Sequence, residues 1–185
     1  MPVRQCASIR VRAAQPTDAA AIARMIRALA RDEGTISRMG AASVRTNGFG
    51  PGAHFSLLIA ETEPAEGESA PQALGYALFF PFFDTDDGLP GNFLADLYVI
   101  PAARGRGVGR ALMAELGAVT ESAGRHFMVW TVRTDNEPAL RLYRRLGALS
   151  GNQAVHFIHG GALQRLADRS RTRSSRPRGR GTADA

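Results

Sequence analysis

The sequence predicts an α/β (α+β) fold in which helices flank one mixed sheet. A chain of 185 residues is long enough for one packed core and short for two, which favours a single domain. Three apolar segments with aromatic residues follow one another with only loops between them, as the strands of an antiparallel meander do. A helical pattern then separates the third strand from a further one, and such a crossover is parallel and right-handed.

The predicted elements begin with a strand and an amphipathic helix. Residues 9–13 alternate apolar and basic side chains, as strands do, and residues 15–18 supply a helix start. The apolar face of that helix comprises Ile22, Met25, Ile26 and Leu29. Residues 31–52 are rich in Gly, Ser, Thr and Asn, so we expect an irregular connection there with only short helical stretches.

The meander follows this connection. Its three strands are predicted at residues 55–60, 74–83 and 92–100. A long loop at 61–72 and a turn at 84–91 separate them, and Pro101 ends the third.

The second half of the chain alternates helices and strands. A helix is predicted at 109–123, because Leu112, Leu116 and Val119 share one face and Gly124 follows. The aromatic and β-branched residues of segment 127–132 predict a buried strand there. A helix from Asn136 to Gly147 and a short strand at 155–158 complete the prediction.

The positive charge of the chain is concentrated at its C-terminus. From Arg169 onward six arginines face one acid, Asp184, so this segment carries +5 of the formal +6. A segment of Arg, Ser, Pro and Gly buries too little apolar surface to offset its ordering entropy. We therefore predict a flexible N-terminus at 1–8, a folded domain at 9–167 and a disordered Arg-rich tail at 168–185. The near-neutral body shows no basic patch with interleaved aromatics, so specific nucleic-acid binding is not expected.

Cysteine content and hydropathy indicate the compartment. The single Cys6 excludes an intrachain disulfide and a cysteine metal cluster, and the four histidines share no ligand spacing, so no metal is expected. No run of about 18 apolar residues is present for a membrane span, and residues 1–12 lack the apolar middle of a secretory signal. These features predict a cytoplasmic protein with no membrane partner.

A glycine-rich loop, residues 104–110, follows the third meander strand and opens a helix. Backbone N–H groups are unpaired at a helix start and the helix dipole favours anions there, so the loop suits a phosphate. A dinucleotide fingerprint fails because Arg110 stands at its sixth place, and an ATPase phosphate loop fails because the chain has no Lys. On spacing alone, a tight structural turn remains the alternative.

The loop resembles the Arg/Gln-x-x-Gly-x-Gly/Ala motif of the GNAT superfamily of N-acetyltransferases, and Leu97-Tyr98-Val99 and a proline precede it as in that family. Residues 47–50, 94–99 and 136–138 resemble diamine N-acetyltransferases in particular. The resemblance covers residues 9–166. It implies the GNAT fold, whose mixed, mostly antiparallel sheet has about six or seven strands. It also implies a homodimeric enzyme that uses acetyl-CoA to acetylate a primary amine of a small molecule, a diamine, polyamine or lysine-like amine.

The resemblance also implies roles for residues. Backbone groups for the pantetheine arm of the coenzyme would come from Leu97, Tyr98 and Val99. Contacts to its pyrophosphate would come from Arg104, Gly105, Arg106, Gly107, Val108, Gly109 and Arg110. Asn136, a good N-cap, falls at a coenzyme-contacting position, and Tyr143, two turns along the same helix face, at the position of the general acid. A phenol with a pKa of about 10 can protonate a departing thiolate, although a Tyr on an apolar helix face is otherwise typical of a core.

The general base is where the sequence departs from the family. Diamine N-acetyltransferases have a Glu before the Asp of the central strand, and here Ala95 precedes Asp96. Adjacent strand residues point to opposite faces, so Asp96 does not simply replace a side chain at position 95. Asp84, Asp86 and Asp87 either attract a cationic amine or are solvated turn residues. Two alternative functions therefore stay open, a non-catalytic acyl-CoA-binding sensor and an acetyltransferase acting on a protein amine.

Overall fold

The computed structural model describes residues 8–63, 71–152, 155–156, 158 and 160–174. The chain divides into two compact units that meet in the sequence at Gly147 and Ala148. Within the described residues, the first unit contains the sheet and helices α1 to α4, and the second contains α5 (Gly160–Ser174). Residues 168–174 of the predicted tail are thus helical. The rest of that tail and residues 1–7 lie outside the described residues.

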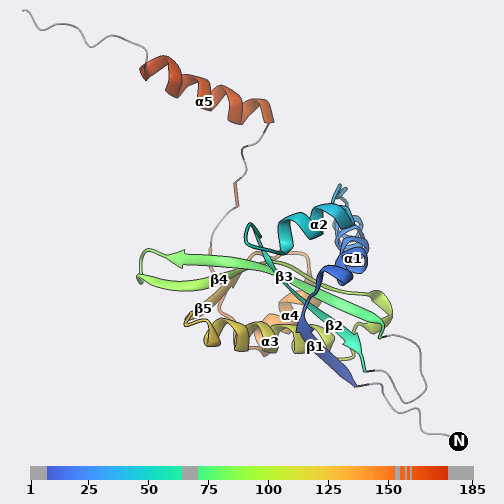
Figure 1. Cartoon of the computed structure of the whole chain (residues 1–185). Coiled ribbons are helices and arrows are strands. Elements are labelled where there is room, and N and C mark those ends of the chain that lie inside the picture. The colour runs from blue at the N-terminus through green and yellow to red at the C-terminus, as the bar shows by residue number, and fades with distance from the viewer. Residues whose placement is uncertain (1–7, 64–70, 153–154, 157, 159, 175–185) are drawn as a thin grey trace, which may run out of the picture. The chain divides into compact units, whose positions relative to one another are not determined.

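Five strands form one sheet in the described part of the chain, in the order β1-β2-β3-β4-β5 (Figure 1). They are β1 (Ile9–Ala13), β2 (Ser56–Thr62), β3 (Ala73–Asp84), β4 (Leu89–Val99) and β5 (Phe127–Trp130). Neighbours from β1 to β4 are antiparallel and β5 is parallel to β4, which confirms the predicted mixed, mostly antiparallel sheet and the parallel crossover.

The strand count corrects the expected six or seven. Val155, His156 and Ile158, from the last predicted strand, have no strand conformation, and Phe157 lies outside the described residues. The described residues of this segment pair with none of the five strands, and they belong to the second unit, whereas the whole sheet belongs to the first.

Helices cover both faces of the sheet (Figure 1). In the first unit they are α1 (Ala19–Asp32), α2 (Ala41–Gly48), α3 (Val108–Ser122) and α4 (Glu137–Arg145). α1 and α2 share one core cluster with Tyr76 and Tyr98 of the sheet. On the other face α3 packs through Leu112 and Leu116, both fully buried. Burying one such leucine contributes about 1.5–3 kcal/mol.

Helix α2, eight residues long, lies inside the segment where the sequence predicted an irregular connection with only short helical stretches. Its Ser, Val, Thr, Asn and Gly residues are weak helix formers, so composition did not show where in the segment a helix would form. Val44 is fully buried in the cluster that α1 shares, and its N–H donates to the carbonyl of Gly40 at 3.0 Å. Tertiary packing therefore outweighs the local preference.

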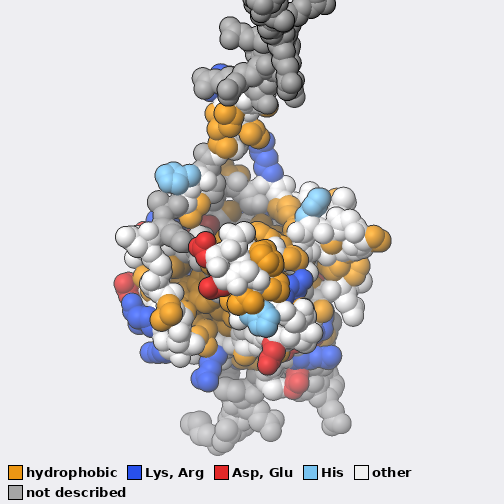
Figure 2. All heavy atoms as spheres, turned by 90° about the vertical axis from the view of Figure 1, so that its left-hand side faces the viewer, with side chains coloured by type: hydrophobic (Ala, Val, Ile, Leu, Met, Phe, Trp, Pro, Cys, Tyr) orange, Lys and Arg blue, Asp and Glu red, His pale blue; other side chains and the backbone are white. Residues whose placement is uncertain are grey.

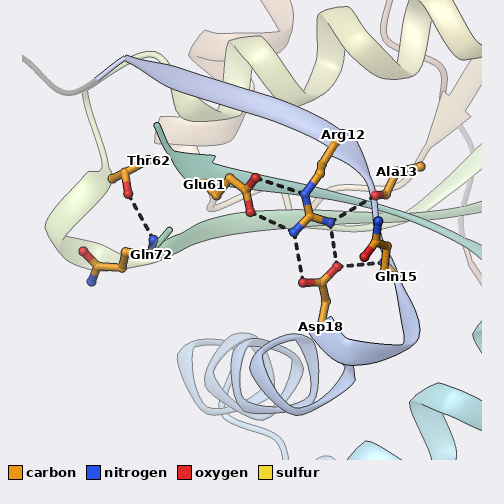
Figure 3. A network of polar contacts seen from close by, with 7 residues as sticks. All are labelled: Arg12, Ala13, Gln15, Asp18, Glu61, Thr62 and Gln72. Carbon is orange, nitrogen blue, oxygen red and sulfur yellow. Dashed lines mark hydrogen bonds and ion pairs between the residues drawn. The ribbon is translucent and has the colours of Figure 1, made fainter. Parts of the chain in front are cut away.

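A network of charged side chains joins β1, β2 and the start of α1 (Figure 3). Arg12 donates two hydrogen bonds to the Asp18 carboxylate, at 2.7 and 3.1 Å, and two to the Glu61 carboxylate, at 3.0 and 2.8 Å. Its remaining N–H donates to the Ala13 carbonyl at 3.2 Å, so all its donors are used. The bond to Asp18 chiefly raises the pKa of Arg12 and lowers that of Asp18. The network anchors α1, whose other end reaches the site described next.

Candidate active site

Strands β4 and β5 pair over a short stretch and then separate. Their register ends where Leu94 pairs with Trp130, the last residue of β5, while β4 continues to Val99. Beyond Leu94, one edge of β4 therefore has no strand partner among the described residues. The Ile100 N–H donates to the Leu74 carbonyl of β3. Backbone groups of successive residues in a strand point to opposite edges, so those of Val99 and Leu97 point away from β3, toward the open edge. An extended ligand with amide groups can pair there as an added strand does.

The glycine loop leads from the end of β4 into α3. Gly105 and Gly107 have φ angles of +75° and +89°, in the left-handed region that favours glycine. Gly107 is the N-cap of α3, and the first turn of that helix has neither a side-chain cap nor an acid. A Cβ atom at Gly105 or Gly107 would meet no heavy atom of the described residues within 4 Å, so a ligand can approach the backbone. The bare helix start, with exposed Arg106 and Arg110 beside it, suits a diphosphate.

The side chain of Arg104 is engaged with β4 and α1. Its Nε donates to the Val99 carbonyl at 3.0 Å, and its Nη2 lies 2.6 Å from the Asp32 carboxylate. The guanidinium carbon also lies 5.6 Å from the centroid of the Tyr98 ring. The positive charge of Arg104, which we expected to act on the coenzyme's pyrophosphate, is therefore partly neutralised by Asp32. Both partners are about half exposed, so the ion pair contributes at most about 1 kcal/mol.

Helix α4 begins after Asn136 and brings Tyr143 close to the point where β5 leaves β4. Asn136 is the N-cap, as predicted, because its Oδ1 accepts a bond from the Ala139 N–H at 3.2 Å. The ring centroids of Tyr143 and Trp130 are 4.9 Å apart. Burial raises the pKa of Tyr143, so its hydroxyl keeps its proton at neutral pH and is available as a donor.

Strand β4 has a β-bulge at Ala95, directly before Asp96. The register with β3 shifts between Leu94 and Asp96, which leaves the exposed Ala95 without a partner in β3. Leu94 packs in the α3 cluster, whereas Asp96 bonds to Tyr76, which belongs to the α1 cluster. In a regular strand Leu94 and Asp96 would share one face. The bulge therefore turns Asp96 to the α1 side.

Asp96 is a largely buried carboxyl group with a neutral hydrogen-bond donor. Tyr76, fully buried in β3, donates its hydroxyl proton to Asp96 Oδ2 at 2.8 Å. Burial raises the pKa of Asp96, and the bond from Tyr76 lowers it in part. A carboxylate with a raised pKa is more basic than an ordinary Asp, which suits the removal of a proton from an ammonium group.

Glu33, directly after α1, is a candidate that the sequence interpretation missed. Burial raises the pKa of Glu33, the negative charges of Asp96 and Asp32 raise it further, and Arg133 lowers it. Glu33 and Asp96 are therefore close enough to interact. The sequence contained a signal for this candidate. Asp32 and Glu33 stand at the C-terminal end of a helix, where the helix dipole disfavours acidic residues, which points to a role other than helix stabilisation.

The hairpin between β3 and β4 carries the acids for which the sequence left two roles open, attraction of a cationic amine or solvated turn residues. Asp84 Oδ1 accepts hydrogen bonds from the backbone N–H groups of Asp86, at 2.8 Å, and Asp87, at 3.4 Å. Asp84 thus stabilises its own turn. It pairs with Leu89, and β4 from Leu89 to Asp96 spans roughly 20 Å at about 3.3 Å per residue. The structure does not bring Asp84 and Asp86 to Asp96.

Other features of the described residues lie apart from this site. No group of three or more His, Cys, Asp or Glu side chains among them is placed to hold a metal ion. None of the helices found there has the length and apolar character needed to cross a bilayer. A cavity of about 690 Å³ along α1 is lined by Arg12, Glu61 and Tyr98 among others, but not by Asp96 or Tyr143. The candidate active site is the open edge of β4, not this cavity.

Comparisons with known proteins show the family to which the chain belongs. Residues 24–148 match the model of the Acetyltransferase (GNAT) family. Thialysine N-epsilon-acetyltransferase of Mus musculus is 33% identical over 170 residues, which are 88% of this chain and 99% of the relative. Spermidine/spermine N(1)-acetyltransferase-like protein 1 of Homo sapiens is 29% identical over 153 residues, which are 80% of this chain and 22% of that protein. An integron cassette protein from the mobile metagenome of V. cholerae has a TM-score of 0.69 at 20% identity, over 86% of this chain and 98% of its own.

The sheet that opens between β4 and β5 beside a glycine loop defines an acetyltransferase fold, and the matches extend over most of the chain. The chain belongs to the GNAT family of acetyltransferases. It is an N-acetyltransferase, which confirms the predicted family and enzyme class.

Proposed function

We propose that the chain transfers the acetyl group of acetyl-CoA to a primary amine of a small molecule by direct attack. One observation carries the proposal: one edge of β4 has no strand partner beyond Leu94 in the described part of the chain, Asp96 belongs to that stretch, and a bare helix start follows the end of the strand. Tyr143 packs its ring on Trp130, the residue of β5 at which the pairing ends. GNAT acetyltransferases use acetyl-CoA, which when bound supplies the acetyl thioester. The residues present here fit that molecule.

Each part of the coenzyme has a matching surface in this proposal. Its amide-containing arm pairs with the outward backbone groups of Leu97 and with the N–H of Val99, whose carbonyl accepts from Arg104, and its diphosphate is held by the first N–H groups of α3. Arg106 and Arg110 add charge at the rim. Asn136 uses its Oδ1 for the helix cap, which leaves its Nδ2 for the coenzyme.

The transfer needs three proton movements. An ammonium group cannot attack a carbonyl carbon, so Asp96 first accepts a proton from the bound acceptor. The amine nitrogen then bonds to the thioester carbon, the carbon–sulfur bond breaks, and the Tyr143 hydroxyl gives its proton to the departing sulfur. The nitrogen, now positively charged, loses its second proton to form the amide, and this proton replaces the one that Tyr143 gave. Juxtaposition of the two substrates supplies much of the rate, and no acyl-enzyme forms.

The acceptor is proposed to be a cationic amine. Asp96 and Glu33 provide two carboxyl groups at its end of the site, and an ammonium group near both relieves their mutual repulsion. The relatives named for thialysine and for spermidine/spermine are consistent with such an acceptor. We propose a lysine-like amine or a diamine as the first choice.

An assay of thiol release from acetyl-CoA tests the proposal. Thialysine, lysine, putrescine and spermidine serve as acceptors, and a neutral hydroxyl analogue serves as the control. We expect release with at least one cationic amine, and a loss of about 10²-fold or more in kcat/KM for Asp96→Asn. If acetyl-CoA raises the melting temperature but no amine supports release, the chain is an acyl-CoA-binding sensor and the proposal is wrong.

We also propose that two copies of the chain pair through the β3–β4 hairpin. Phe82 and Phe83 are 42% and 56% exposed there, and Leu89 is 37% exposed. Figure 2 faces this end of the molecule and shows hydrophobic side chains gathered near the middle of the view. Sedimentation equilibrium should give a dimer for the intact chain and a monomer for Phe83→Asp. A monomeric intact chain would exclude the pairing.

A further inference from the structure

Tyr76 has no part in the function proposed above, yet its hydroxyl reaches the acceptor site. Its side chain is fully buried and lies on the α1 face of β3. The ring packs beside Tyr98, with centroids 6.3 Å apart, so its position is fixed. A buried hydroxyl without a partner is costly, and the partner that the structure gives this one is Asp96 Oδ2, at 2.8 Å.

We propose that Tyr76 is a positioning residue for the acceptor amine, because its hydroxyl holds the Asp96 carboxylate in the charged form and orientation that receive an ammonium group. The proposal rests on the proposed function, which assigns Asp96 to the amine. The bulge at Ala95 makes the contact possible, since a regular strand would turn Asp96 to the α3 face.

The surroundings of Asp96 explain why such a donor is needed. Burial favours the neutral acid and raises the pKa of Asp96. The charges of Asp96, Arg133 and Asp32 act on the pKa of Glu33, from the end of α1. The hydrogen bond from Tyr76 opposes the burial and favours the carboxylate, and it is the side-chain bond to Asp96 that the described residues provide.

Tyr76→Phe tests the proposal because it keeps the ring and removes the donor. The readout is the titration of the Asp96 carboxyl carbon by NMR in the intact, ligand-free protein. We expect the midpoint to move up by about one pH unit, the size of shift that a hydrogen bond to a charged group produces. Fluorotyrosine placed at position 76 and at no other position has nearly the same shape as tyrosine and is a stronger hydrogen-bond donor. It should therefore lower the titration midpoint of Asp96.

Thr120→Val is the matched control. Thr120 is also buried, and its hydroxyl accepts from Asn92 at 2.8 Å and donates to the Leu116 carbonyl at 2.7 Å, on the α3 side. Its loss should lower the melting temperature and leave the Asp96 midpoint unchanged. An unchanged midpoint in both position-76 variants would overturn the proposal, and the fluorotyrosine protein decides it if Tyr76→Phe does not fold.

Activity gives a second readout. In Tyr76→Phe, kcat/KM for the amine should fall about tenfold below the shifted midpoint and recover as the pH rises above it. In an Asp96→Asn background the same substitution should change nothing further. A loss of equal size at every pH would show a merely structural role. If the unmodified chain acetylates no amine, the proposed function fails, and the NMR titration still decides whether Tyr76 sets the charge of Asp96.

Discussion

At the residue scale, burial prepares Tyr143 and Asp96 for opposite directions of proton transfer. Burial raises the pKa of both groups. For the phenol this keeps the proton in place until a thiolate needs it. For the carboxyl group it increases basicity, and the Tyr76 hydroxyl prevents that group from becoming permanently neutral. One physical effect thus serves a donor and an acceptor because the two groups start on opposite sides of neutral pH.

Tyr143→Phe should lower kcat about tenfold or more, because the variant keeps the ring packed on Trp130 but has no proton to give. The dissociation constant of acetyl-CoA, measured by calorimetry, should stay within about twofold of the original. An unchanged kcat would remove Tyr143 as the general acid. A large loss of coenzyme affinity would instead assign it to binding.

Asp96→Asn should stabilise the folded protein at neutral pH. The pKa of Asp96 in the folded protein is raised above its value of about 3.9 in the unfolded chain. Its contribution to the stability of the fold is therefore complete only below about pH 3.9. That contribution is lost as the pH rises through the folded pKa, because the charged form is disfavoured in the folded protein. The neutral amide avoids the loss and still accepts from Tyr76. Melting temperatures of the two proteins should therefore differ at pH 7 and converge toward pH 3. A constant difference across that range would contradict the assignment.

At the element scale, the start of α3 determines coenzyme binding. Gly107→Val should abolish the rise in melting temperature that acetyl-CoA produces, because φ of +89° strains a β-branched residue and its side chain would occupy the space beside the first N–H groups. Gly117→Ala, inside the same helix and with no heavy atom within 4 Å of the added Cβ, is the control. It should raise stability by about 0.5–1 kcal/mol and leave coenzyme binding unchanged. Full coenzyme binding by Gly107→Val would contradict the loop assignment.

The elements also show what the sequence could predict. The strand Ile9–Ala13 has its predicted bounds, and the strand, glycine loop and helix succession is as expected, because these signals are local. The bulge at Ala95 and the bounds of α2 could not be predicted, since both depend on contacts with distant segments. Glu33 was missed for the same reason: only the folded chain brings the end of α1 to Asp96.

At the scale of the whole molecule, the candidate active site belongs to the first unit, and most of the net positive charge belongs to the second. The sheet, the glycine loop and α4 all precede Gly147, whereas the segment from Arg169 onward carries +5 of the formal +6. Catalysis and any contact with polyanions should therefore be separable.

A chain that ends at Asp168 tests this separation. Thiol release with acetyl-CoA and the preferred amine should stay within about twofold, because no residue assigned to the site is removed. Retention on heparin at low salt should fall sharply, since six arginines are lost and non-specific polyanion binding follows the number of cationic contacts. The intact chain should lose its retention as salt rises, which separates an electrostatic contact from a specific one. A large loss of turnover in the shortened chain would show that the Arg-rich segment completes the active site.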